Sequence, residues 1–335
     1  MQGLERVQMI IEVERLRKEF NGVVAVDGIS FSVERGEIFG FLGPNGAGKT
    51  TTINILTTLL APTSGTARIA GYDVVKQPEQ VRRRIGLVPQ EVVLEGDLTA
   101  RENLIFHGML YGLSRQQIES RISELLDIVE LEDRAESKVR TFSGGMKRRL
   151  ELVKVLLHEP EVVFLDEPTV GLDPQTRRRI WEYIRTLNTE RGVTVFLTTH
   201  YMEEAEQLCD RVCIIDHGRI LDIDQPDRLK HRLGEGEMVE IELAERCEEF
   251  VRSLGEAGYR IKSATGCRVT VVAERSERVL AEVFSLADRL GTGIVSISIR
   301  KPTLEDVFIH YTGRSIRDEA AGDTRIREIA RRLKH

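Results

Sequence analysis

Short apolar runs alternate with longer amphipathic segments over the first two thirds of the chain. The run Ile38–Leu42 is continuously apolar, as in a strand buried on both faces of a sheet, and it leads into a glycine-rich turn and a predicted helix over Lys49–Leu60. Further strands are predicted at Ile10–Leu16, Ile29–Val33, Ile85–Val88, Glu161–Leu165, Val193–Leu197 and Arg211–Ile215. Further helices are predicted at Ala100–Tyr111, Arg115–Glu130, Gly145–Leu157 and Pro174–Glu190. This alternation predicts an α/β domain with a mostly parallel sheet covered by helices.

The pattern changes near Asp224-Gln225-Pro226, where a short helix to about Leu233 precedes a glycine-containing break. The segments that follow read strand, helix, strand, strand, helix, strand: Met238–Leu243, Cys247–Ala257, Arg260–Ser263, Arg268–Val272, Ser276–Leu290 and Gly293–Ile299. This order fits a small ferredoxin-like sandwich, with a less regular α+β unit as the alternative. Helices are also expected at Thr303–Tyr311 and Asp323–Lys334. The predicted organisation is a first domain at 9–224, an accessory domain at 225–313 and a charged helical tail at 314–335.

Composition narrows the class of protein without naming a function. The 335 residues include 48 basic and 54 acidic ones, a net charge of −6, and only 5% are aromatic, which argues against a protein held mainly by nucleic-acid phosphates or stacked bases. No stretch approaches the roughly 20 apolar residues that cross a bilayer, and the charged start MQGLERVQ does not resemble a signal peptide. The four cysteines form no CxxC pair, so we expect buried thiols in a reducing cytosol.

A phosphate-binding motif follows the buried strand. It matches G-x-x-x-x-G-K-[ST] and consists of Gly43, Pro44, Asn45, Gly46, Ala47, Gly48, Lys49 and Thr50, with Thr51 next in the helix. The glycines let successive backbone N–H groups face one anion, and the helix N-terminus adds positive charge there. Lys49 would contact the β- and γ-phosphates, and the Thr50 hydroxyl would contact Mg²⁺. The alternative is a glycine-rich turn with an incidental lysine.

Two carboxylates end a later buried strand. The run Val162–Leu165 is apolar and leads into Asp166 and Glu167. In a P-loop nucleotide triphosphatase, an aspartate at such a position holds the Mg²⁺, and a carboxylate beside it can deprotonate the attacking water. Alone, an acidic pair at a strand end would favour a turn or a helix cap; after a complete P-loop it becomes a candidate metal and catalytic pair.

Five further positions make the sequence resemble the ATP-binding cassette (ABC) family. The segment Phe142-Ser143-Gly144-Gly145-Met146 resembles the family signature, and the other positions are Gln90 as the Q-loop glutamine, Asp173 in the D-loop, His200 as the switch histidine and Phe20 as the adenine-stacking aromatic. Met146, Phe142 and Val170 depart from the usual residues. Four of these positions also have a structural alternative: a helix N-cap for Ser143, a surface loop for Gln90, a structural histidine with satisfied hydrogen bonds for His200, and a core role for Phe20.

The resemblance implies a P-loop cassette with a RecA-like core, a helical subdomain and an antiparallel β subdomain. It implies that two cassettes bury two ATP and Mg²⁺ between them, with Ser143, Gly144 and Gly145 facing the γ-phosphate of the other copy. His200 and Gln90 would sense the γ-phosphate and the metal, and Asp173 would cross the interface. One cassette is present, so we expect a homodimer or a heterodimer with another cassette.

Within the family, the segments Phe142–Arg149 and Lys301–Phe308 resemble the daunorubicin-resistance type of exporter ATPase. That resemblance implies a peripheral subunit on the cytoplasmic face of the membrane, driving a permease on a separate chain through residues of about 91–136. The alternatives are a soluble ABC ATPase in translation or DNA repair, or an ATP-gated regulator. No nucleic-acid partner is expected.

Overall fold

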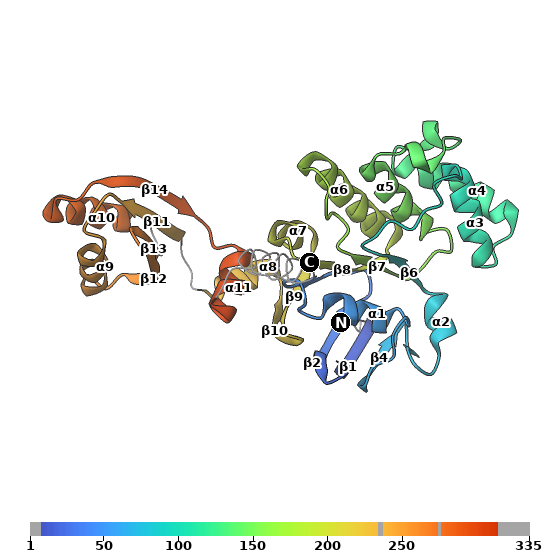
Figure 1. The fold of residues 1–335 in the computed structure, drawn as a ribbon, viewed down its shortest axis with the longest axis horizontal. Helices are drawn as coiled ribbons and strands as arrows, with labels where there is room; N and C mark the ends of the chain where they lie inside the picture. The colour runs from blue at the N-terminus through green and yellow to red at the C-terminus, as the bar shows by residue number, and fades with distance from the viewer. Residues whose placement is uncertain (1–7, 234–236, 274–275, 314–335) are drawn as a thin grey trace, which may run out of the picture. The chain divides into compact units, whose positions relative to one another are not determined.

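The chain divides into two compact units. The first ends at Pro226, and the second begins at Asp227. The computed structural model describes residues 8–233, 237–273 and 276–313 (Figure 1). The predicted tail at 314–335, including its helix, lies outside the described residues. None of the helices in the described part of the chain is long and apolar enough to cross a membrane.

The first unit is built on a six-stranded sheet in the order β10-β9-β3-β8-β7-β6. Its strands are β3 (Ile38–Leu42), β6 (Ile85–Val88), β7 (Val162–Asp166), β8 (Thr194–Thr199), β9 (Arg211–Asp216) and β10 (Arg219–Asp224). Five of them run parallel, and β10 pairs antiparallel with β9. The strands β3, β7 and β8 are buried at every position, which explains the apolar runs Ile38–Leu42, Val162–Leu165 and Val195–Leu197 within them. The predicted parallel sheet is therefore confirmed.

An antiparallel sheet in the order β2-β1-β4-β5 completes the core of this unit. Its strands are β1 (Met9–Phe20), β2 (Val23–Glu34), β4 (Ser64–Ile69) and β5 (Tyr72–Asp73). Helix α1 (Lys49–Leu56) lies between the two sheets (Figure 1), and its Ile53, Ile55 and Leu56 join one apolar cluster with side chains of both. Burial between two sheets fixes the helix that follows the P-loop.

Helices cover the other face of the parallel sheet, where Figure 1 shows α3 to α6 opposite β1, β2 and β4. The helices of this unit are α2 (Pro78–Arg82), α3 (Ala100–Leu110), α4 (Arg115–Ile128), α5 (Gly144–Lys154), α6 (Pro174–Arg191) and α7 (Met202–Leu208), with short 3-10 turns at Glu132–Arg134 and Val139–Thr141. Capping boxes begin α3 and α4, with Thr99 and Ser114 as the N-cap residues. The helical and antiparallel β subdomains are thus both present.

The second unit has four antiparallel strands in the order β12-β13-β11-β14. Its elements are α8 (Pro226–His231), β11 (Glu237–Leu243), α9 (Cys247–Glu256), β12 (Arg260–Thr265), β13 (Arg268–Ala273), α10 (Ser276–Leu290), β14 (Ile294–Arg300) and α11 (Leu304–Thr312). Apolar side chains of α9 and α10, including Phe250 and Val283, pack on one face of the sheet. Numbered within the unit, the strand order is 4-1-3-2, so the ferredoxin-like interpretation is confirmed over the less regular alternative.

The expectation of four free thiols is wrong for two of them. Cys209 and Cys213 are buried and free, but Cys247 and Cys267 form a disulfide. Cys247 begins α9 and Cys267 precedes β13, which brings their Cα atoms to 5.0 Å, within disulfide range. Because the pairing follows from the packing of a helix on a strand, the spacing of the cysteines along the chain gave no sign of it.

Candidate active site

The carboxyl ends of three neighbouring parallel strands bring the candidate residues together. Leu42 at the end of β3 pairs with Thr199 of β8, and Asp166 at the end of β7 pairs with Thr198. The P-loop begins after β3, Glu167 follows β7, and His200 follows β8. The backbone N–H of Gly43 donates to the Thr199 carbonyl at 3.2 Å, which ties the start of the P-loop to β8. Sheet register therefore determines the site.

The P-loop has its glycines where the backbone requires them. Gly48 precedes α1 with φ +100°, and a Cβ there would lie 2.5 Å from the Ala25 carbonyl oxygen of β2. No side chain caps the N-terminus of α1, while Asn45, Gly46 and Thr50 are exposed. The first-turn N–H groups of α1 are therefore available to an anion, as the motif predicts.

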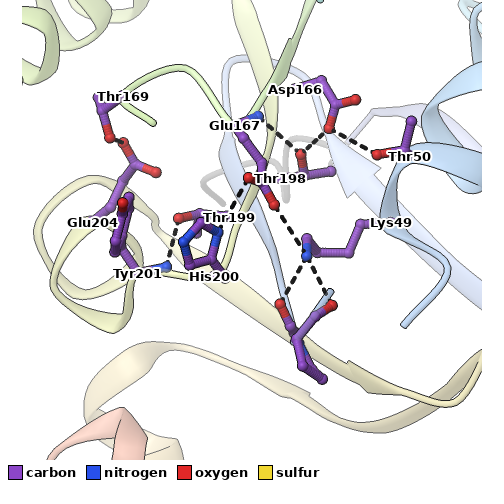
Figure 2. A network of polar contacts seen from close by, with 12 residues as sticks. Lys49, Thr50, Asp166, Glu167, Thr169, Thr198, Thr199, His200, Tyr201 and Glu204 are labelled. Atoms are coloured by element: carbon purple, nitrogen blue, oxygen red, sulfur yellow. Dashed lines mark hydrogen bonds and ion pairs between the residues drawn. The ribbon is translucent and has the colours of Figure 1, made fainter. Parts of the chain in front are cut away.

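Lys49 points into the loop that it follows. Its ammonium donates to the carbonyl oxygens of Gly43 at 2.8 Å and Pro44 at 3.0 Å, and it lies 3.2 Å from Glu167 Oε1 (Figure 2). Burial lowers the pKa of the Lys49 ammonium, and the charge of Glu167 acts against this shift. Both side chains are less than a tenth exposed. A triphosphate on the P-loop would therefore compete with Glu167 for Lys49.

Glu167 is held at its backbone and at its side chain. Its φ of +49° is unusual for a residue with a side chain, and its N–H donates to the carbonyl and the hydroxyl oxygen of Thr198, each at 3.1 Å. Its Oε2 lies 3.1 Å from His200 Nδ1 (Figure 2). Burial would raise the pKa of Glu167, but His200 and Lys49 together lower it below its usual value. The carboxylate is therefore ionised at neutral pH and can accept a proton.

Asp166 and Thr50 place oxygen atoms that can act as metal ligands beside Glu167. Thr50 Oγ1 lies 3.4 Å from Asp166 Oδ1, and Thr198 donates a hydrogen bond to the same carboxylate oxygen (Figure 2). Asp166 is 4% exposed. A carboxylate and a hydroxyl are ligands that suit Mg²⁺, which keeps waters and phosphate oxygens in its remaining positions. The residues present therefore fit a magnesium ion bound together with a nucleotide.

A buried carboxyl group that sequence reasoning missed supports the loop after Glu167. Glu204 of α7 is fully buried and accepts hydrogen bonds from Thr169 Oγ1 at 2.7 Å and Trp181 Nε1 at 2.9 Å. Burial raises the pKa of Glu204. Glu204 thus connects the segment after Glu167 with the helix after His200 (Figure 2). The sequence pattern did not predict the short helix α7, so this acid had no assigned position.

Five predicted positions lie outside this cluster of contacts. Ser143 and Asp173 are exposed N-caps of α5 and α6: Ser143 Oγ accepts from Met146 N–H at 3.3 Å, and Asp173 Oδ1 accepts from Thr176 N–H at 3.0 Å. Gly144 and Gly145 begin α5 beside them. Gln90 is exposed after β6, and none of the hydrogen bonds or ion pairs among the described residues joins it to Asp166.

Phe20 is the remaining candidate. It ends β1 with 42% of its surface exposed, and Lys18 Nζ lies 4.9 Å from its ring centroid. The core alternative for Phe20 is therefore wrong, because its side chain is exposed.

A P-loop, a carboxylate pair and a histidine at adjacent strand ends, with helical and antiparallel β subdomains around them, define an ATPase of the ATP-binding cassette class. Residues 26–170 match the family model described as ABC transporter, and residues 225–312 match that of the DrrA1-3-like ATP-binding protein C-terminal domain.

Curated relatives match along nearly the whole chain. The linearmycin resistance ATP-binding protein LnrL of Bacillus subtilis is 40% identical, covering 92% of this chain and 100% of its own. The daunorubicin resistance ATP-binding protein DrrA3 of Streptomyces coeruleorubidus is 39% identical, covering 96% and 98%. A solved dimeric ATP-binding cassette in a post-hydrolysis state, bound to ADP and Pi, is 27% identical with a TM-score of 0.58, covering 64% and 98%. The chain belongs to the DrrA-like ATP-binding proteins of the ABC transporter family.

The chain is therefore the ATP-binding and ATP-hydrolysing subunit of an ABC exporter. Subunits of this family form dimers and act with a membrane permease. The relatives give no support to the alternative of a regulator or an ATPase of translation or DNA repair.

Proposed function

We propose that two copies of this chain enclose two ATP molecules, and that Glu167 activates the water that attacks each γ-phosphate. The observation that carries this proposal is the position of the Glu167 carboxylate, ionised and held between Lys49 and His200 at 3.2 and 3.1 Å. When Lys49 turns to the phosphates, the carboxylate keeps His200 as its neighbour and can take a proton from water. His200 orients the carboxylate and contacts the γ-phosphate.

Thr50 and Asp166 would hold Mg²⁺, which when bound neutralises charge on the phosphates. Lys49 and the N–H groups of the P-loop, from Gly43 to Thr51, bind the phosphate oxygens. Gln90 completes the metal site from the neighbouring loop. Phe20, an exposed aromatic side chain at the end of β1, stacks on the adenine.

The second copy supplies the residues at the starts of α5 and α6. Ser143, Gly144 and Gly145 are at an exposed helix N-terminus, where a hydroxyl, N–H groups and the helix dipole favour an anion. Asp173 is exposed at the next helix start. In a symmetric homodimer, every contact that one copy makes is repeated by the other, so the starts of α5 and α6 would lie at the interface on both copies.

The permease is a separate chain, and the subunit binds it from the cytoplasmic face of the cell membrane. Large apolar side chains are exposed along the predicted contact region: Val92, Val93, Phe106, Met109 and Leu110. Exposed apolar groups of this kind are typical of a protein-binding surface.

The substitution Glu167→Gln tests the site. The variant should bind ATP, form a long-lived ATP-bound dimer and lose at least ~100-fold in kcat, because a glutamine cannot accept the proton. ATPase assays and size-exclusion chromatography with ATP and Mg²⁺ measure both effects. Glu203→Gln, at an exposed position of α7, is the matched control and should leave turnover unchanged. Normal turnover by Glu167→Gln would refute its role.

We further propose that the transported molecule is an antibiotic, because relatives that match nearly the whole chain are named for linearmycin and daunorubicin resistance. Cells that express the chain with its permease should tolerate higher concentrations of such a compound than cells carrying the Glu167→Gln variant. If cells with the wild-type chain and cells with the Glu167→Gln variant are equally susceptible to every compound of a panel that includes linearmycin and daunorubicin, this substrate class is wrong.

A further inference from the structure

Arg148 is a buried charge on α5 that the family motifs leave unexplained. It is 4% exposed, and its guanidinium reaches main-chain oxygens on two other segments. Nε donates to the Pro168 carbonyl at 2.7 Å, and Nη2 donates to the carbonyls of Asp166 at 3.2 Å and Glu167 at 3.3 Å. Nη1 donates to the Pro89 carbonyl at 2.6 Å. One side chain therefore holds the main chain at the carboxylate pair and the residue before Gln90.

Glu151, one turn further along α5, completes the connection. Its Oε2 accepts from Arg148 Nη1 at 3.2 Å, and its Oε1 accepts from the Val93 N–H at 2.6 Å. Lys154, on the next position of the same face, donates to the Val93 carbonyl at 2.7 Å. Both ends of the segment 89–93, which carries Gln90, are thus fastened to α5.

Burying an ion pair such as Arg148 and Glu151 costs free energy, and removing one partner of the buried pair costs free energy as well. Glu151 is fully buried, so each ion needs its partner and its hydrogen bonds. The planar, forked guanidinium suits several carbonyl oxygens at once, whereas a lysine ammonium at the same place is a single point charge on a flexible stem. The contacts of Arg148 therefore depend on the shape of the guanidinium as well as on its charge.

We propose that Arg148, paired with Glu151, is a positioning residue for ATP hydrolysis. It fixes the main chain of Glu167 and the loop of Gln90 relative to the helix that begins at Ser143. When Ser143 contacts the γ-phosphate bound by the other copy, α5 is displaced. The contacts of Arg148 and Glu151 then move the Glu167 carboxylate and Gln90 together with α5. This inference rests on the proposed role of Glu167 as the base.

The test compares Arg148→Lys with Arg149→Lys in the purified full-length chain. Arg149 is the adjacent arginine on α5, but its Nη1 donates to the Val129 carbonyl at 2.7 Å, away from the carboxylate pair. Arg148→Lys should lower kcat at least ~10-fold with the KM for ATP within about threefold, because the P-loop is untouched. Arg149→Lys should keep kcat within about twofold.

Three results of this comparison would overturn the positioning role: retention of more than half of kcat by Arg148→Lys, an equal loss in both variants, or a change confined to KM. Glu167→Gln is assayed in parallel, because its normal turnover would refute the proposed base whatever Arg148 does. An inactive Glu167→Gln with an active Arg148→Lys refutes only the positioning role.

The double variant Arg148→Met/Glu151→Met covers the case in which a single substitution does not fold. Removing both charges spares the cost of an unpaired buried ion, so the thermal midpoint should recover relative to Arg148→Met. The proposal expects kcat to stay low in this double variant, because the ties to Glu167 and Pro89 are still missing. Recovery of kcat together with the thermal midpoint would show a structural role only.

Discussion

Single residues at the strand ends carry the chemistry. The motifs predicted Lys49, Asp166, Glu167 and His200 from their order along the chain, and the structure brings all four to one edge of the sheet. Their mutual contacts were not predictable, because a pairing such as that of Lys49 with Glu167 depends on side-chain directions. The φ of +49° at Glu167 likewise has no sequence signal, since glutamate rarely adopts it.

Gly145 gives a prediction at this scale. A Cβ there would lie 2.6 Å from Thr176 Cγ2, and Thr176 is held by Asp173, which accepts from its hydroxyl at 2.6 Å. Gly145→Ala should therefore lower the free energy of unfolding by about 1–3 kcal/mol through overpacking, and it should disturb the cap of α6. Chemical denaturation followed by circular dichroism measures the change.

Gly144→Ala is the control, since its nearest neighbour would be Leu172 at 4.0 Å. The control should unfold as the wild type does. If Gly145→Ala is equally stable, Thr176 moves aside without cost and the packing account of Gly145 is wrong.

Among the elements, those with a strong apolar pattern agree well with their predictions. The strands β3 and β6 have the predicted bounds, and α10 does also. The missed elements are β4, β5, β10, α2 and α7. Strand β4 buries only two of its six residues, and α7 has seven residues, fewer than the window of about 11 over which a helical period is recognised, so neither gives a strong apolar pattern.

Helix α11 begins inside the segment Lys301–Phe308 that the sequence singled out, and its start is held by a capping box of Thr303 and Asp306. This carboxylate is 5% exposed and receives hydrogen bonds from Arg300 and from the backbone N–H of Thr303 at 2.9 Å, with Lys262 at 3.3 Å. Burial alone would raise the pKa of Asp306, but these partners lower it to about 2. The motif therefore holds α11 to β12 and β14 of the second unit.

Asp306→Asn tests this contribution. A carboxylate whose folded pKa lies below its unfolded value of 3.8 stabilises the fold above that pH and ceases to do so as the pH falls toward 2. The variant should lose about 2 kcal/mol of stability at pH 7, and the difference from wild type should shrink below about pH 4. Hydrogen exchange of α11 peptides and urea unfolding at several pH values measure this.

Asp288→Asn, at an exposed position of α10 in the same unit, is the control and should not alter the protection of α11. A loss of stability in Asp306→Asn that does not depend on pH would contradict the electrostatic account.

At the scale of the whole molecule, the sequence by itself determined the architecture of the first unit and the class of protein. The buried apolar runs predicted a parallel sheet, and the P-loop with its carboxylate pair predicted an ATPase. These features are local or periodic, so they can be recognised along one chain. For the second unit the sequence predicted the order of strands and helices but left a less regular α+β unit open, and the strand order 4-1-3-2 of the structure decided for the ferredoxin-like sandwich.

Only the tertiary structure decided the contacts between segments far apart in the sequence. It paired Cys247 with Cys267, buried Glu204 beside Thr169, and placed the Arg148 guanidinium on the carbonyls of Pro89 and Glu167. Each of these depends on which element packs against which and on where a side chain points once it is buried. Those properties arise when the sheets and helices assemble, and no spacing along the chain records them.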